Sequence, residues 1–185
     1  MKIQSLTAAV ILSLSLASAA VAGGGPKNPL VGGAAMYQTR DIIDNAVNSK
    51  DHTTLVAAVK AAGLVETLKS PGPFTVFAPT DAAFAKLPAG TVETLVKPEN
   101  KAALTGILTY HVVAGRLDAK ALSKQVKDGG GSATLTTVKG DPLTVTAQGK
   151  SLVLTDAKGG TSTVTIGDVY QSNGVIHVVD SVLLP

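Results

Sequence analysis

Two apolar stretches, far apart in the chain, decide the fold: FTVFAPTDAAF at residues 74–84 and NGVIHVVDSVLLP at residues 173–185. The first stretch begins with β-branched and aromatic residues, Phe74–Ala78, which predict a strand buried on both faces. Pro79 ends that strand, because proline has no backbone N–H to donate. The second stretch predicts the last strand, Val175–Leu184, and its continuous apolar run favours a central position in a sheet.

The polar residues inside these stretches favour structural roles. We expect Thr80 or Asp81 to cap a short helix after the first strand, because each carries an oxygen that can accept the N–H groups of a first helical turn. Asp81 as a catalytic acid or base is the alternative, but no second acidic residue follows until Glu93. His177 lies inside the last strand, where a lone histidine is more often a hydrogen-bonded structural residue than a metal ligand.

The rest of the chain divides into a helical first half and a second half of strands. Apolar residues at helical spacing predict the helices, and β-branched runs separated by glycine-containing turns predict the hairpins. The expected helices are 41–48, 53–62, 64–68, 91–96 and 99–108, and the expected strands are 133–138, 143–147, 152–155 and 163–169. With the two apolar stretches, this pattern predicts a single α+β domain.

The first residues are typical of a secretory signal peptide. Lys2 precedes a short apolar run, and small residues follow it in an Ala-x-Ala pattern. We expect cleavage after Ala22, with Ala19 as the alternative, so residues 1–22 would be removed. An uncleaved membrane anchor is the other interpretation, but the apolar run is short for a span and is broken by Ser and Thr. The mature chain is therefore expected to be secreted or periplasmic, without a membrane span.

The segment after the expected cleavage site differs from the domain that follows. Residues 23–36 are rich in glycine and proline and show no periodicity, which predicts a flexible lead-in. The folded domain is then expected to cover residues 37–185.

Composition excludes several classes of function. The formal charge is +3 and falls by one with the signal peptide, and the chain has no tryptophan, so a nucleic-acid binder is not expected. The absence of cysteine excludes disulfides and thiolate metal sites. The histidines show no local ligand spacing, and the chain has neither a nucleophile elbow nor a phosphate loop. We therefore predict no catalytic residues, no metal and no cofactor.

A third feature, the Tyr110-His111 pair, lies between the two stretches. With it, the sequence resembles the fasciclin-like (FAS1) domain over about Tyr37–Pro185, in the form of a small bacterial secreted member. The first stretch is similar to the Thr-Val-Phe-Ala-Pro-Thr-Asp motif of that family, and the second to its Asn-Gly-x-x-His-x-x-Asp motif. We expect structural roles for the motif residues Phe77, Pro79, Thr80, Asp81, Phe84, Asn173, Gly174, His177 and Asp180.

The resemblance implies a β-sandwich-like pair of sheets packed with several helices. It also implies cell adhesion, by binding extracellular matrix, polysaccharide or cell-surface proteins, with no enzyme activity and no cofactor. One alternative is an exported hydrolase of envelope polysaccharide, which needs two carboxylates in a cleft, such as Asp81, Asp168 or Asp180. A second alternative is an envelope scaffold that has no ligand.

The Tyr110-His111 pair has two interpretations. It could be an exposed contact site, which makes these residues the candidate interaction residues. Alternatively, Tyr110 packs its ring into the core and His111 is a partly buried structural residue. The second interpretation needs a hydrogen-bond partner for His111, and we expect either Asp81 or a backbone group, because an unpaired polar group among valines is costly.

Overall fold

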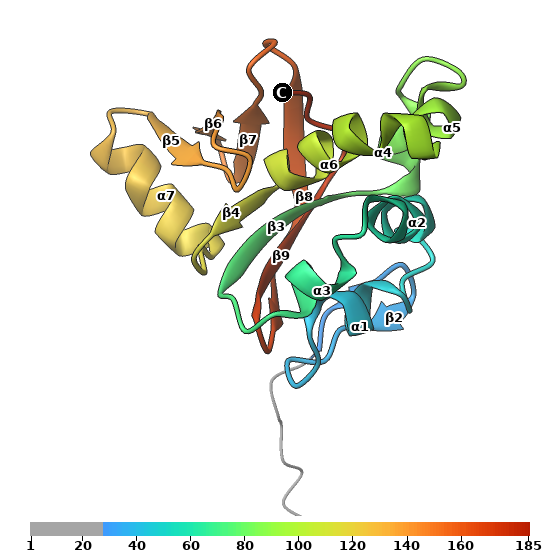
Figure 1. Cartoon of the computed structure of the whole chain (residues 1–185). Helices are drawn as coiled ribbons and strands as arrows, with labels where there is room; N and C mark the ends of the chain where they lie inside the picture. Colours follow the sequence, from blue (N-terminus) through green and yellow to red (C-terminus); the bar gives the residue numbers. More distant parts are fainter. Residues whose placement is uncertain (1–27) are drawn as a thin grey trace, which may run out of the picture.

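The two apolar stretches lie side by side as neighbouring interior strands of a seven-stranded sheet, and we call them the central strands (Figure 1). The structure is a computed structural model that describes residues 28–185. Strands β3 (Phe74–Pro79) and β9 (Gly174–Val179) pair in parallel, and their register places Phe77 beside His177. Every residue of β9 is buried, and so is β3 after its first residue. The prediction of two strands covered on both faces is therefore confirmed.

The sheet is mixed and curls back on itself. Its other strands are β4 (Val112–Ala114), β5 (Ser132–Thr136), β6 (Pro142–Gln148), β7 (Ser151–Thr155) and β8 (Thr161–Gln171), and the spatial order is β4-β3-β9-β8-β7-β6-β5. Just after β5, the Val138 N–H donates to the Val112 carbonyl at 2.7 Å, and Val113 bridges to Thr137. The two ends of the sheet therefore meet. The expected α+β fold is confirmed, and one continuous sheet supplies both of its facing halves.

Helices fill the space on both sides of the central strands (Figure 1). They are α1 (Ile42–Ala46), α2 (Thr53–Ala62), α3 (Val65–Lys69), α4 (Asp81–Ala85), α5 (Thr91–Leu95), α6 (Lys101–Tyr110) and α7 (Ala119–Asp128), with a short 3-10 turn at Pro98–Asn100. Gly63 ends α2 in the left-handed conformation, with φ of 73°, where a residue without a side chain avoids strain.

Two apolar clusters form the core, one on each face of β3 and β9. On one face, Val76 and Ile176 pack against α1, α2, α3 and α6. On the other face, Phe77 and Val179 pack against α7 and the inner side of the β5–β7 hairpins. Successive residues of each central strand therefore contribute to opposite clusters.

The lead-in prediction is wrong for the residues just before the domain. Leu30–Val31 and Ala34–Ala35 form a small hairpin, β1 and β2, and Val31 and Met36 are buried against the first cluster. Burial of the apolar side chains of Val31 and Met36 favours packing of this part of the segment against the domain. The remainder of the lead-in and the predicted signal peptide lie outside the described residues.

The last strand is shorter than predicted. β9 ends at Val179, and residues 180–185 leave the sheet although they include further apolar residues. The Ser162 hydroxyl donates to the Ser181 carbonyl at 2.9 Å and accepts its N–H at 3.0 Å, so these groups are taken out of the ladder. The chain then turns inward and buries Leu183 in the second cluster.

Candidate functional site

His111 is a buried link between helix α6 and the C-terminal segment. Its Nδ1–H donates to the Ile107 carbonyl at 2.8 Å, and its Nε2 accepts the Leu183 N–H at 3.0 Å. These backbone groups are its partners, and Asp81 is not among them. Burial lowers the pKa of His111 to about 4, against the Ile107 carbonyl and the Asp156 carboxylate, which raise it. The ring is therefore neutral at physiological pH, in the tautomer that both bonds require.

Tyr110 is a second buried link, between the start of β6 and the β7–β8 turn. Its hydroxyl donates to the Pro142 carbonyl at 2.8 Å and accepts the Ala157 N–H at 3.0 Å. The ring is fully buried in the second cluster. Burial raises the pKa of the phenol, so it keeps the proton that it donates.

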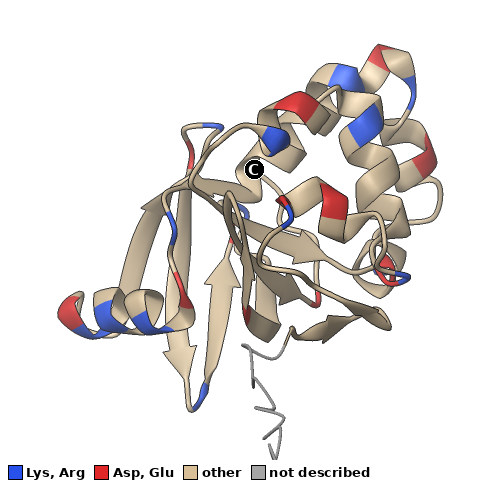
Figure 2. Cartoon of the chain, turned by 90° about the horizontal axis from the view of Figure 1, so that it is seen from below, with Lys and Arg blue, Asp and Glu red and all other residues tan. Residues whose placement is uncertain are grey.

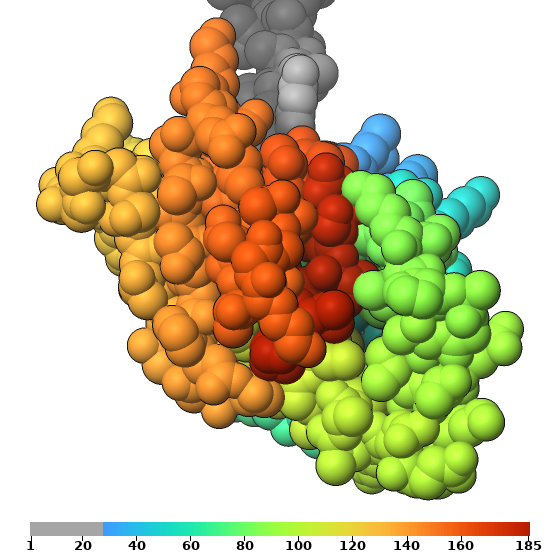
Figure 3. Space-filling model, turned by 90° about the horizontal axis from the view of Figure 1, so that it is seen from above, coloured from blue at the N-terminus to red at the C-terminus, as the bar shows by residue number. Residues whose placement is uncertain are grey.

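The Tyr-His pair lies beneath three surface segments, which we call the loop face. They are the β5–β6 turn (137–141), the β7–β8 turn (156–160) and the C-terminal segment (180–185). Asp156 adds a further tie, because its Oδ2 accepts the Leu184 N–H at 3.0 Å. Neither Tyr110 nor His111 reaches the surface in this structure, so a partner would touch the segments above them. Figure 3 shows the C-terminal residues lying between the later strands and the helices of the first half.

Asp81 caps a helix, though not the helix that it begins. Its carboxylate accepts the Thr53 hydroxyl at 2.6 Å, the Thr54 N–H at 2.8 Å and the Thr53 N–H at 3.3 Å, at the N-terminus of α2. The Thr80 hydroxyl caps α4 instead, by accepting the Ala83 N–H at 3.2 Å. Partial burial raises the pKa of Asp81, but the bonds from Thr53 and Thr54 outweigh it, so the pKa lies below its ordinary value.

Replacing Asp81→Ala is expected to lower the free energy of unfolding by about 1–2 kcal/mol, the usual cost of losing a helix cap. Urea unfolding followed by circular dichroism measures this loss. Asp51→Ala is the matched control, because Asp51 is an exposed neighbour whose backbone carbonyl, not its side chain, bonds to Asp81. Equal losses in the two variants would contradict the capping role.

His177 joins β9 to the start of α7. Its Nε2–H donates to the Leu117 carbonyl at 2.8 Å, its Nδ1 accepts the Asp168 N–H at 3.4 Å, and its ring stacks on Phe77 with centroids 5.7 Å apart. Burial lowers the pKa of His177, against the Leu117 carbonyl and nearby carboxylates. Asp168, at φ of 57°, accepts the Ala119 N–H at 2.7 Å.

The remaining motif residues also hold elements together. Asn173 binds α1 and the end of α3 through its side chain, and Gly174 lies so close to β3 that an added Cβ would be 2.1 Å from the Phe74 carbonyl oxygen. Asp180 accepts the Thr163 N–H at 2.9 Å. Phe84 packs in the first cluster.

The buried polar pair Asn45 and Gln171 was not predicted from the sequence. The Asn45 amide donates to the Tyr37 carbonyl at 2.7 Å and to the Gln171 side chain, and its oxygen accepts the Tyr37 N–H at 2.9 Å. Asn45 has no exposed surface, and it fixes the segment before α1 to the end of β8. Its place within an apolar helical stripe, three residues after Ile42, was the signal that could have identified it.

The three aspartates proposed for hydrolysis have separate tasks. Asp81 caps α2, Asp168 accepts the N–H of Ala119 at the start of α7, and Asp180 holds the end of β9 to β8. Within residues 28–185, no group of three or more His, Cys, Asp or Glu could hold a metal ion. In the same part of the chain, no helix is long and apolar enough to cross a membrane.

Comparisons with known proteins agree with this architecture. The family model described as Fasciclin domain matches residues 50–185. Protein sll1483 of Synechocystis is 47% identical over 159 residues, covering 86% of this chain and 81% of that protein. Immunogenic protein MPB70 of Mycobacterium bovis is 43% identical, over 76% of this chain and 66% of its own length. Cell surface glycolipoprotein MPB83 of the same species is 34% identical, over 86% and 67%.

A solved structure shares the fold. It is the FAS1 domain pair of the insect cell adhesion molecule fasciclin I, which superposes with a TM-score of 0.70 at 21% identity. The match covers 79% of this chain and 51% of that one, so the chain spans about half of the pair.

Proposed function

Because the chain belongs to the fasciclin domain family, we propose that it is an exported adhesion module that binds extracellular polysaccharide or cell-surface proteins through the loop face. One observation carries this proposal: the Tyr110 hydroxyl bonds to Pro142, which directly follows the β5–β6 turn, and to Ala157 of the β7–β8 turn, while the His111 ring bonds to Leu183 of the C-terminal segment. The pair thus holds the loop face from below. Loops held on a rigid scaffold present a preorganised surface, which lowers the entropy lost on binding.

The composition of the loop face suits contact with polar polymers. Val138, Lys139 and Lys158 are exposed there, beside the glycines of both turns. Charges of both signs are intermixed over the helices and turns, while most of the sheet is uncharged (Figure 2). Recognition would therefore depend on shape and hydrogen bonds more than on a field of one sign.

The proposal is tested with the protein recovered after export. The labelled protein is applied to whole cells and to an array of glycans and matrix proteins, then compared with Tyr110→Phe, which removes one hydroxyl, and with Lys158→Ala. We expect saturable binding to at least one partner, weakened roughly tenfold by either change, which is about 1.4 kcal/mol.

The matched control is Lys124→Ala, because Lys124 is exposed on α7, which contributes no segment to the loop face. Thermal melts confirm that each variant folds before binding is measured. An absence of binding to every surface would overturn the adhesion proposal and favour the scaffold without a ligand. Binding that only the Lys124→Ala control weakens would move the site to α7.

A further inference from the structure

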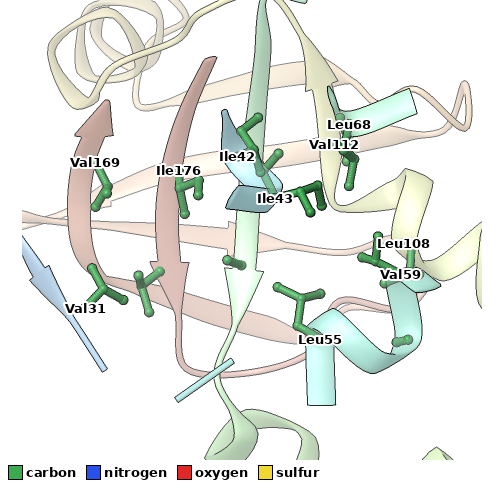
Figure 4. Packing of buried hydrophobic residues seen from close by; sticks show 14 of the residues in the cluster. Val31, Ile42, Ile43, Leu55, Val59, Leu68, Leu108, Val112, Val169 and Ile176 are labelled. Carbon is green, nitrogen blue, oxygen red and sulfur yellow. The ribbon is translucent and has the colours of Figure 1, made fainter. Parts of the chain in front are cut away.

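A cavity lies in the first apolar cluster, between the central strands and the helices. Its volume is about 40 Å³, and its wall includes Ile42 of α1, Leu55 of α2, Leu108 of α6, Val169 of β8 and Ile176 of β9. Figure 4 shows these side chains gathered between the central strands and the helices. Since helices and strands from both halves of the chain contribute to its wall, the cavity is a feature of the fold and not of a single loop.

One residue that lines the cavity carries a buried polar atom without a hydrogen-bond partner among the described residues. His52, which is 3% exposed, contacts the Ser49 hydroxyl through Nδ1 at 2.8 Å, but its Nε2 has no hydrogen bond within residues 28–185. Burial lowers the pKa of His52, and the nearby Ala78 carbonyl raises it in part. No hydrogen bond of normal geometry joins this carbonyl to Nε2 of His52. His111 also lines the cavity, but both of its ring nitrogens are engaged elsewhere.

Water alone fits this wall poorly. Roughly 10–15 Å³ of such volume holds one water, so the size allows about three, but each water needs two to four polar partners. The exposed wall is almost entirely carbon, and His52 is the lining residue whose ring nitrogen has no hydrogen-bond partner in the described part of the chain. An occupant with one hydrogen-bonding atom and an apolar remainder would satisfy the nitrogen and also fill the rest of the space.

We propose that this cavity is a binding site for a small uncharged amphiphile, a short alkyl group with one hydroxyl or carbonyl oxygen that hydrogen-bonds to Nε2 of His52. Space for about three waters limits the occupant to a short-chain alcohol or carbonyl compound of a few carbons. Ala46 of α1 and Val56 of α2 are the partly exposed residues of the wall. The ligand enters between these two helices, on a side of the fold that is separate from the loop face.

The test uses the full chain with ¹³C-labelled methyl groups and a ¹⁵N-labelled histidine ring. Isobutanol is the amphiphilic probe, xenon the apolar probe and isobutyrate the charged probe of matching shape. We expect isobutanol and xenon to shift the methyl resonances of Ile42, Leu55 and Val169 saturably, and isobutanol alone to shift the Nε2 resonance of His52. Isobutyrate should not bind, because the wall offers no counter-charge.

A pair of variants with the same chemical change controls the experiment. Val169→Ile adds one methyl group to the cavity wall and should weaken isobutanol binding roughly tenfold, or about 1.4 kcal/mol. Val164→Ile adds the same group in the second cluster and should leave binding unchanged. An equal loss of isobutanol binding in the two variants would contradict the location of the site in this cavity. Resonance shifts confined to surface residues would contradict it as well. Xenon binding without isobutanol binding, or isobutyrate binding as tightly as isobutanol, would overturn the role of His52.

Discussion

Replacing Asn173→Ala is expected to lower the free energy of unfolding by about 4 kcal/mol, the largest loss that we predict for one side chain. The Asn173 oxygen accepts the Ile42 N–H at 3.1 Å, and its amide donates to the Leu68 carbonyl at 2.6 Å and the Ser70 carbonyl at 2.9 Å. Truncation leaves three backbone groups without a partner in a buried place, and each costs about 1–3 kcal/mol.

The position of Asn173 explains why the cost should be so large. The residue precedes β9, and its three bonds bring the start of α1 and the end of α3 to the edge of the central strands. Gly174 has to follow it, because the backbone passes so close to the Phe74 carbonyl that no side chain fits. The Asn-Gly pair therefore joins the helical half to the sheet through contacts that span more than a hundred residues of sequence.

Urea unfolding of the wild type, Asn173→Ala and Ser172→Ala measures the effect. Ser172 is exposed, and its bond to the Arg40 carbonyl uses its backbone N–H, so its change to alanine should cost less than about 0.5 kcal/mol. Asn173→Asp keeps the acceptor for Ile42 but places a carboxylate against two carbonyls, so it should also be strongly destabilised at neutral pH. A loss below about 1 kcal/mol for Asn173→Ala would show that the three contacts contribute little.

The central strands could be predicted because their signal is local. A continuous run of β-branched and aromatic residues specifies a doubly covered strand wherever its partner lies, and β3 and β9 were found in this way. The end of β9 could not be located, because Val182, Leu183 and Leu184 are as apolar as the strand itself. What ends the strand is the Ser162 hydroxyl and the His111 ring, which take the backbone groups of this segment from positions distant in sequence.

The motif residues show the same limit at the level of single side chains. That Asp81 caps a helix follows from its residue type and its place after a strand. The helix that it caps is α2, however, and its partner Thr53 lies twenty-eight residues earlier in the sequence. Likewise, the need of His111 for a partner followed from its valine neighbours, while the partner itself depends on tertiary structure. The kind of role that a side chain has was therefore predictable where its residue type permits few roles. The identity of its hydrogen-bond partner was not.

The free energy of unfolding is expected to fall by about 3 kcal/mol through His111 alone as the pH decreases from 7 toward 4. The pKa of this ring is about 4 in the folded protein and 6.5 as the ordinary value, and each pKa unit corresponds to about 1.4 kcal/mol. Over this range the unfolded chain binds a proton that the folded chain excludes, so the contribution is present in full above pH 6.5 and is lost progressively as the pH falls from 6.5 to about 4. The structural reason is that protonated Nε2 would present its hydrogen to the Leu183 N–H.

Urea titrations at several pH values between 7.5 and 4.5, on the wild type and His111→Gln, separate this contribution from the others. Glutamine offers an N–H donor group and an acceptor oxygen in a different geometry and does not titrate, so the variant should be less stable at neutral pH and should lose less stability in acid. His52 and His177 keep a pH dependence in the variant, because burial lowers the pKa of each. If His111→Gln loses as much stability in acid as the wild type, then the acid sensitivity originates at other groups and His111 is not the link that holds the C-terminal segment against α6.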